Sequence, residues 1–216
     1  MSDSPGILLG HQFDDIEQQR EASILAMWVF LATEILLFGG LFFAYTAYRQ
    51  AFPGAFAAAS NKTVYWIGTL NTGVLLISSV TMALSVHAAR EGRRKALLRF
   101  LLATLFLGLT FLGLKGFEYY LDYESHIVPG LNWPITNNFT RHQAIFFLLY
   151  FFMTGLHAFH LTVGCCLVSL MIFWTWRGRF SKEHYIPIDL TGLYWHLIDL
   201  VWIFLYPLFY LPGRHL

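Results

Sequence analysis

Five long apolar stretches run through this sequence and restrict the folds open to it. They cover about residues 22–48, 62–88, 96–121, 143–176 and 190–212. Each is longer than the roughly 20 residues that an α-helix needs to cross the hydrocarbon core of a bilayer. Because lipid offers the backbone no hydrogen-bond partner, such stretches satisfy their own N–H and C=O groups by forming helices. The sequence therefore predicts an all-α bundle that crosses a membrane about five times.

The composition supports this prediction and leaves little room for another domain. Charged residues make up 12% of the chain, against about a quarter in a typical soluble domain. The connections are short, and the longest covers residues 122–142. Residues 1–21 are polar and lack the basic start and apolar segment of a signal peptide. We therefore expect a polar N-terminal tail over 1–21 and a single transmembrane domain over 22–216.

Basic residues are distributed unevenly between the two sides of the predicted bundle. With five spans, the N-terminus and the second and fourth connections share one side. That side carries nine basic residues: Arg20, Arg90, Arg93, Arg94, Lys95, Arg99, Arg177, Arg179 and Lys182. The opposite side carries four: Arg49, Lys62, Arg141 and Arg214. Because connections rich in Lys and Arg stay in the cytoplasm, we expect a cytoplasmic N-terminus, an external C-terminus and a location in a cytoplasmic (inner) membrane of the bacterial type.

Several classes of site are excluded by what the sequence lacks. Its two cysteines, Cys165 and Cys166, are adjacent in an apolar run, which excludes a disulfide framework and a cysteine-based metal site. The motifs of covalent haem, P-loops, zinc proteases and serine hydrolases are absent. No basic stripe suggests nucleic acid as a partner. We therefore expect no catalytic residue, cofactor or metal in this chain.

Ionisable side chains inside a bilayer are energetically unfavourable, so each one calls for a specific explanation. Glu34 lies near the middle of the first stretch, in MWVFLATEILLFGG. It could accept a proton or contact lipid, or it could be an acid hydrogen-bonded to a neighbouring helix. Lys115 and Glu118 are three residues apart and share a helical face, which favours a local ion pair. Glu118 could also face a lipid headgroup or a partner helix.

Two pairs of polar residues with the same spacing occur in the last two stretches. His157 and His160 could contribute to a metal site, but Glu34 or His196 would have to supply a further ligand. Interhelical hydrogen bonding is the better explanation for both histidines. His196 and Asp199 could form a proton relay or a polar clasp with a partner.

The basic end of the predicted bundle suggests contact with lipid headgroups. His87 is most simply an interface residue beside the turn that follows the second stretch. Arg90, Arg93 and Arg94 could hold anionic headgroups, each contributing about 1 kcal/mol.

Five segments, taken in order, resemble subunit III of the haem–copper cytochrome c oxidases. They read MWVFLATEILLFGGLFFAY, LNTGVLLISSVTMA with HAAREGRRK, LGLKGFEYY, TGLHAFHLTVG and YWHLIDLVWIFLYPLFYL. The resemblance covers about residues 22–212 and matches the last five helices of the seven-helix members. One position departs from those members, because Trp66 stands where they carry a second carboxylate.

The resemblance implies an accessory subunit without a redox centre of its own. Its partners would be the catalytic subunit I, which holds the haems and copper, together with subunit II, alone or in a larger respiratory supercomplex. It would bind phospholipids and support the stability and proton uptake of an aerobic, oxygen-reducing complex. The positions implied to handle lipid or protons are Glu34, Glu118, His157, His160, His196 and Asp199.

Two other functions remain open on the sequence. A branch of the same family accompanies nitric oxide reductases, and the run EILLFGGLFFAYTAYRQAFPGAF would suit either branch. A self-standing transporter or proton channel is an alternative of another class. Such proteins typically contain inverted repeats or broken helices near the middle of the membrane, and the sequence suggests neither.

Overall fold

The computed structural model of the chain describes residues 15–131, 137–180 and 185–213. Within these ranges every regular element is a helix. The helices are α1 (Ile16–Ala51), α2 (Pro53–Ser60), α3 (Tyr65–Arg90), α4 (Arg94–Glu124), α5 (Asn138–Trp176) and α6 (Ile186–Tyr210). Five of them are long and apolar enough to cross a membrane, which confirms the predicted all-α fold with five spans. Most of the expected N-terminal tail lies outside the described residues, as do Lys182 and Arg214.

Two helices, α1 and α5, begin several residues before their apolar stretches because polar caps define their first turns. Asp15 begins α1, and its side chain accepts a hydrogen bond from the backbone N–H of Gln18 at 2.7 Å. Asn137 begins α5 by forming a reciprocal capping box with Thr140. Such caps satisfy N–H groups that have no partner in the first helical turn. A prediction based on apolar length alone misses these polar turns.

The connection between the first two spans contains the short helix α2, which the sequence analysis treated as a loop. Pro53 ends α1 at Ala51, as expected, but it also occupies the first turn of α2. Proline is tolerated there because the first N–H groups of a helix have no intrahelical acceptor. Phe56 is buried, and the Ser60 hydroxyl donates to the carbonyl of Phe209 at 2.8 Å. The α2 helix therefore packs mainly against α5 and is hydrogen-bonded to the C-terminal end of α6.

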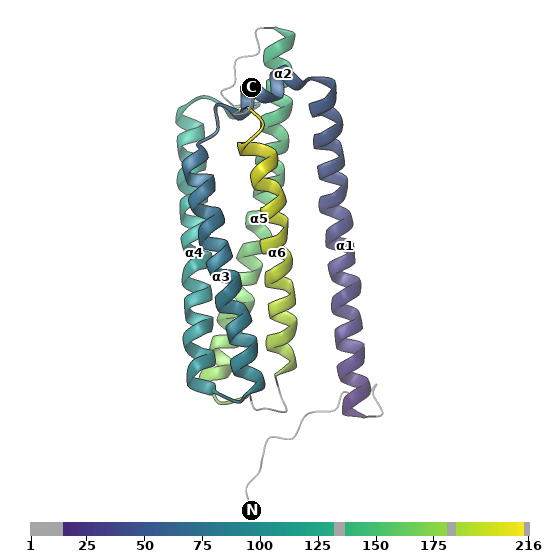
Figure 1. The fold of residues 1–216 in the computed structure, drawn as a ribbon, viewed down its shortest axis with the longest axis vertical. Coiled ribbons are helices and arrows are strands. Elements are labelled where there is room, and N and C mark those ends of the chain that lie inside the picture. Colours follow the sequence, from purple (N-terminus) through teal and green to yellow (C-terminus); the bar gives the residue numbers. More distant parts are fainter. Residues whose placement is uncertain (1–14, 132–136, 181–184, 214–216) are drawn as a thin grey trace, which may run out of the picture.

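Helices α3 to α6 form a bundle, and α1 stands at its side (Figure 1). In the bundle α3 packs against α4 and α6, and α5 packs against the same two helices. Helix α1 packs mainly against α5 and α6. Only 11% of its apolar window is buried inside the chain, and the residues that it buries are Leu31, Phe38 and Tyr45. Most of α1 therefore faces the surroundings of the molecule.

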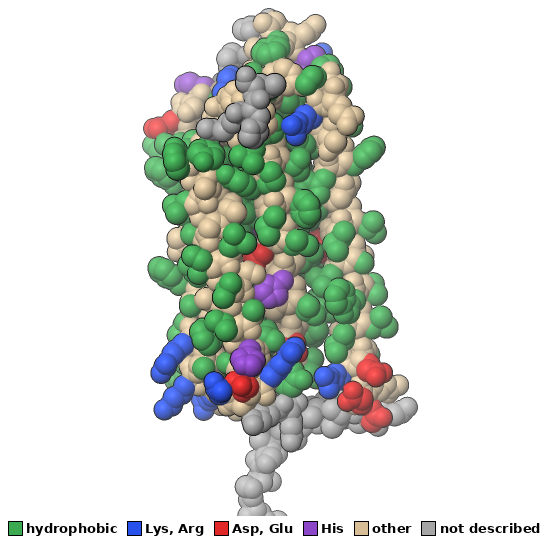
Figure 2. Space-filling view, in the orientation of Figure 1, with side chains coloured by type: hydrophobic (Ala, Val, Ile, Leu, Met, Phe, Trp, Pro, Cys, Tyr) green, Lys and Arg blue, Asp and Glu red, His purple; other side chains and the backbone are tan. Residues whose placement is uncertain are grey.

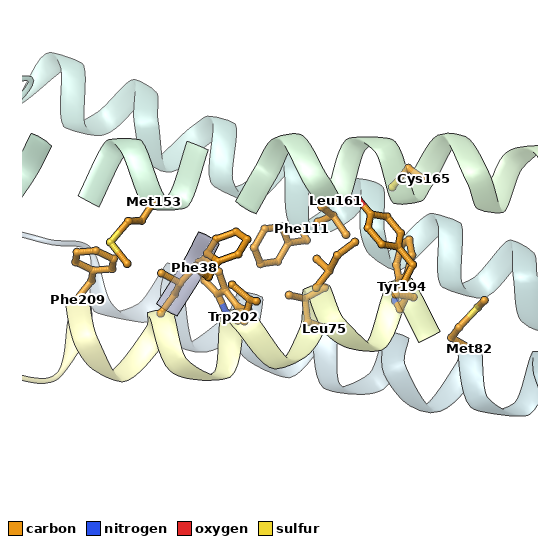
Figure 3. Packing of buried hydrophobic residues seen from close by; sticks show 14 of the residues in the cluster. Phe38, Leu75, Met82, Phe111, Met153, Leu161, Cys165, Tyr194, Trp202 and Phe209 are labelled. Carbon is orange, nitrogen blue, oxygen red and sulfur yellow. The ribbon is translucent and has the colours of Figure 1, made fainter. Parts of the chain in front are cut away.

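The bundle interior is built from large apolar and aromatic side chains (Figure 3). Trp202 and Phe111 meet edge to face with their ring centroids 4.7 Å apart. Close helix contact is possible where α4 carries Gly108, because a Cβ there would lie 2.8 Å from the Trp195 ring. Small residues allow such approach in membrane bundles, where packing stabilises helix association.

The outer surface matches a protein embedded in lipid. Large apolar side chains cover the middle of the visible face, whereas Lys and Arg side chains gather near the end where α1 begins (Figure 2). Leu36 and Phe43 are among the most exposed of these apolar side chains, both on α1. A soluble protein rarely exposes an apolar surface of this kind. The molecule is therefore a multi-pass membrane protein.

Candidate functional site

One predicted pair of residues meets across two helices inside the membrane-spanning region. Glu34 on α1 and His160 on α5 lie with Oε2 and Nε2 3.0 Å apart. Their side chains are only 14% and 12% exposed. The ring of Phe38 packs against the imidazole with centroids 5.5 Å apart. This contact brings polar side chains of α1 and α5 together within the membrane-spanning region.

A contact at the other ring nitrogen of His160 fixes how its imidazole faces Glu34. The Nδ1 atom of His160 lies 2.8 Å from the carbonyl oxygen of Leu156. A carbonyl oxygen only accepts, so Nδ1 carries a hydrogen. The Nε2 atom therefore faces Glu34 Oε2 at ion-pair distance, although this oxygen makes no hydrogen bond within the described part of the chain.

His157 does not join this pair. Its ring packs against the rings of Phe111 and Trp202, with centroids 5.5 Å and 5.1 Å away. Its Nε2 atom has no hydrogen-bond partner among the described residues. His160 therefore lies at ion-pair distance from a carboxyl of another helix, whereas His157 packs among aromatic rings. In the described part of the chain, no group of three or more His, Cys, Asp or Glu side chains is placed to hold a metal ion.

His196 and Asp199 lie where α6 meets α3. The Nδ1 atom of His196 is 2.9 Å from the Ser79 hydroxyl and 3.8 Å from Asp199 Oδ2. Asp199 is buried, whereas the His196 side chain is partly exposed. Beside them, the indole N–H of Trp195 donates to Ser78 at 3.1 Å. These polar contacts link two helices of the same chain.

His196 also lines a pocket between α1, α3 and α6. The pocket has a volume of about 310 Å³. Its wall is mostly apolar, with residues such as Ile24, Val86 and Leu193. Arg20, Arg90 and Asp189 are its charged residues, and Arg90 contacts Asp189 at 3.2 Å. An apolar pocket with guanidinium groups suits an amphiphile with an anionic head.

The other basic candidates differ in how they are engaged. Arg94 donates to the carbonyl of Thr175 at 2.9 Å and also to the carbonyl of Trp176. It therefore caps the C-terminal end of α5, which carries carbonyls without intrahelical partners. Arg93 and His87 both contact Glu91, at 2.9 Å and 3.5 Å. These two side chains are largely exposed at the basic end of the molecule.

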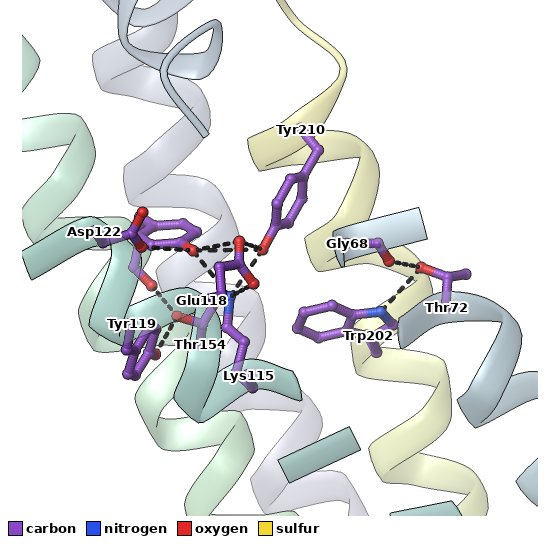
Figure 4. A network of polar contacts seen from close by, with 10 residues as sticks. Gly68, Thr72, Lys115, Glu118, Tyr119, Asp122, Thr154, Trp202 and Tyr210 are labelled. Atoms are coloured by element: carbon purple, nitrogen blue, oxygen red, sulfur yellow. Dashed lines mark hydrogen bonds and ion pairs between the residues drawn. The ribbon is translucent and has the colours of Figure 1, made fainter. Parts of the chain in front are cut away.

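The ion pair expected from the spacing of Lys115 and Glu118 is present at 3.0 Å. It belongs to a larger buried cluster that the sequence analysis missed (Figure 4). The cluster also contains Asp122, Tyr150 and Tyr210. Asp122 follows Glu118 by four residues on the same helical face, so its spacing could have indicated membership. The tyrosines come from α5 and α6, and no local pattern identifies them.

Comparison with known proteins gives a consistent result along the whole chain. A sequence model described as cytochrome c oxidase subunit III matches residues 15–214. The cytochrome c oxidase subunit 3 of Loxodonta africana is 29% identical over 213 residues, which is 93% of this chain and 72% of that protein. The corresponding protein of Oncorhynchus mykiss is 28% identical over 214 residues, covering 96% of this chain and 75% of its own length.

A third relative agrees. The cytochrome c oxidase subunit 3 of Gadus morhua is 28% identical over 207 residues, covering 93% of this chain and 72% of that protein. The family match extends from the first turn of α1 to just beyond the end of α6. It includes both helices that hold the Glu34–His160 pair and all three that form the Lys115 cluster. The chain therefore belongs to the cytochrome c oxidase subunit III family.

Proposed function

We propose that this chain is the subunit III-like accessory subunit of a respiratory haem–copper terminal oxidase. The family match over residues 15–214 carries this proposal. The partner subunits I and II are expected to reduce oxygen and to hold the haems and copper, within the oxidase alone or within a larger respiratory supercomplex. This chain would hold no redox centre and would support the stability of the complex.

Helix α1 is the element best suited to contact a partner subunit. Its outward face is apolar, and at Gly39 and Gly40 an added Cβ would meet no other atom of the chain within 4 Å. Glycines on an open helix face allow the backbone of another helix to approach closely. The catalytic subunit is the expected partner at this face.

The pocket between α1, α3 and α6 is the expected phospholipid site. Arg20 and Arg90 would contact the headgroup, and the apolar wall would contact an acyl chain. Arg93 and His87 would meet further headgroups at the same end. We expect the basic end, with the N-terminal tail over residues 1–21, to lie on the cytoplasmic side of a bacterial-type inner membrane, because connections rich in Lys and Arg stay in the cytoplasm.

The Glu34–His160 pair is the expected proton-handling group of this subunit. A carboxyl and an imidazole only 3.0 Å apart can pass a proton between them with little rearrangement. Glu118, His157, His196 and Asp199 are expected to support the surrounding helix packing. The pair would assist proton uptake by the complex and preserve its activity over many turnovers.

Purification through a tag on this chain tests the proposal. A reduced-minus-oxidised visible spectrum of the co-purified complex should show haem bands of an oxidase, and the sample should consume oxygen. Haem b with nitric oxide consumption and no oxygen reduction would point to the nitric oxide reductase branch. A colourless preparation of this chain alone would contradict both. The alternative of a self-standing transporter has less support, because transporters commonly contain broken helices near the middle of the membrane. The five spanning helices of this chain run unbroken.

Glu34→Gln separates a proton role from a lipid role. If the pair handles protons, the assembled complex should keep its phospholipid content but lose activity several-fold faster during turnover. Thr33→Val is the matched control, because Thr33 is exposed and its hydroxyl bonds only to the local carbonyl of Phe30. A Glu34→Gln complex that lasts as long as the parent would remove the pair from the functional residues.

A further inference from the structure

The buried cluster on α4, α5 and α6 contains the ammonium group of Lys115, and each of its three N–H groups has an acceptor. Lys115 Nζ lies 3.0 Å from Glu118 Oε2, 2.9 Å from Tyr150 Oη and 2.8 Å from Tyr210 Oη (Figure 4). A charged lysine has three donors and no acceptor. Three oxygens at these distances therefore use all of them. The lysine and Glu118 are both buried, and they form a charge pair that is neutral by itself.

The hydroxyl hydrogens of Tyr150 and Tyr210 also have an acceptor, which is Glu118. Tyr210 Oη lies 2.6 Å from Glu118 Oε1, and Tyr150 Oη lies 2.9 Å from the same oxygen. Each hydroxyl has one hydrogen to donate. Glu118 therefore accepts from both tyrosines and from Lys115, as an ionised carboxylate does.

Asp122 is a second carboxyl beside Glu118, and it lies next to donors that already bond to Glu118. It is 2% exposed, and its Oδ2 atom lies 3.3 Å from Tyr150 Oη. The hydrogen of that hydroxyl already points to the nearer oxygen of Glu118. At 3.3 Å the Tyr150 hydroxyl gives Asp122 only a long contact, shared with Glu118, so among the described residues this carboxyl has no strong donor of its own to stabilise a negative charge. A proton bound to Oδ2 would turn this contact into a hydrogen bond that the Tyr150 oxygen can accept.

Charge balance leads to the same assignment. The charged groups that act on Asp122 are Lys115 and Glu118 of its own helix, while α5 and α6 contribute the hydroxyls of Tyr150 and Tyr210. One ammonium and two ionised carboxylates would leave an uncompensated negative charge in the bundle interior. Such a charge is strongly disfavoured in an apolar surrounding. A single proton on Asp122 removes it.

We propose that Asp122 is a proton-binding site of this subunit, at the end of the bundle where α4 terminates. Binding places a hydrogen on Oδ2, between the carboxyl and Tyr150. Release breaks that O–H bond, leaves its electron pair on the carboxylate and passes the proton to water at the helix end. The site is separate from the Glu34–His160 pair, and the inference does not rest on the proposed function.

Infrared spectroscopy of the intact purified complex tests this directly. A difference spectrum of the parent minus Asp122→Asn should show a C=O band of a protonated carboxyl that is missing in the variant. Asparagine keeps a hydrogen donor for Tyr150, so the variant is expected to fold. Biosynthetic ¹³C labelling of aspartate in the parent should shift this band, which assigns it without a variant. The labelled band should disappear reversibly as the pH is raised.

A matched control uses the other buried aspartate. Asp199→Asn should leave the Asp122 band unchanged, because Asp199 lies beside His196 and Ser79 rather than in this cluster. The proposal is overturned if Asp122→Asn removes no carboxyl band. It is also overturned if Glu118→Gln, and not Asp122→Asn, removes the band, because the proton would then reside on Glu118. A labelled parent without any titrating aspartate band would overturn it even if the variants fail to assemble.

Discussion

Lys115 is held inside the bundle by contacts that replace its lost hydration. Besides its three hydrogen bonds, its ammonium lies 4.6 Å from the ring centroid of Tyr150 and 5.5 Å from that of Trp202. Cations are attracted to aromatic faces, more strongly when water is excluded. Because the partners of Lys115 lie on α4, α5 and α6, this one residue ties three helices together near one end of the bundle.

Lys115→Met is expected to weaken the subunit severely. It leaves Glu118 as a buried carboxylate without its ion-pair partner, and breaking a buried pair costs about 3–5 kcal/mol. The measurement is the amount of this subunit retained by the complex after detergent extraction. The double variant Lys115→Met with Glu118→Gln should be retained better than Lys115→Met alone. If the two substitutions simply add, the ion pair is not the main stabilising contact.

At the same scale, the sequence identified single residues better than their pairings. Glu34, His160 and Glu118 stood out because charges in long apolar stretches are rare and unfavourable. The contact between Glu34 and His160 depends on how α1 and α5 rotate against each other, which neither stretch specifies alone. Tyr150 and Tyr210 could not be distinguished from the many aromatics that simply fill the interior.

At the scale of the helix, glycines determine how closely neighbours approach. Gly108 on α4 faces the Trp195 ring and Cys165 Sγ, with an added Cβ 2.8 Å and 3.1 Å from them. Gly113 on the same helix is exposed, and an added Cβ would meet nothing within 4 Å. The two positions therefore form a natural pair for comparing packing with helix propensity.

Gly108→Ala should destabilise the complex by about 1–3 kcal/mol, because the new methyl group overlaps a buried indole. Gly113→Ala should be neutral or slightly stabilising, since alanine favours the helix by about 1 kcal/mol. Thermal unfolding of the two purified complexes provides the measurement. Equal shifts in both variants would show that α4 can move away from Trp195 at little energetic cost.

The pocket between α1, α3 and α6 also belongs to this scale, because three helices form it. Arg20→Gln or Arg90→Gln should weaken binding of phosphatidylglycerol to the delipidated complex. The loss should be about fivefold each, which corresponds to about 1 kcal/mol per arginine. Native mass spectrometry of the complex can follow this binding. Arg177→Gln is the control, because Arg177 is exposed at the same end but does not line the pocket. An equal loss in this variant would indicate only nonspecific surface attraction.

The positions of the helices were predictable because apolar length is a property of each segment alone. The polar first turns at Asp15 and Asn137 extended α1 and α5 beyond those limits. Helix α2 was missed because its signal is short and Pro53 also marks the end of α1. Features that depend on contacts between helices, such as the pocket and the Lys115 cluster, required the assembled structure.

For the molecule as a whole, the distribution of charge predicts its orientation. Among the described residues, Arg20, Arg90 and Arg177 mark the end where α1 begins, and the opposite end has fewer basic side chains. Moving a basic connection across the membrane is unfavourable, so the richer end should remain in the cytoplasm. The exposed positions Glu17 and Ser125 lie at opposite ends of the bundle and can report this orientation.

Single cysteines at these positions, in a chain with Cys165→Ala and Cys166→Ala, make the orientation measurable. Ser125→Cys should react with a membrane-impermeant maleimide in intact cells, because α4 should end on the external side. Glu17→Cys should react only in inverted vesicles, where the cytoplasmic face is open to the reagent. Oxygen consumption by each variant complex verifies that the labelled chain is assembled. The reverse labelling pattern would contradict the orientation, and it would place Asp122 rather than the phospholipid pocket at the cytoplasmic end.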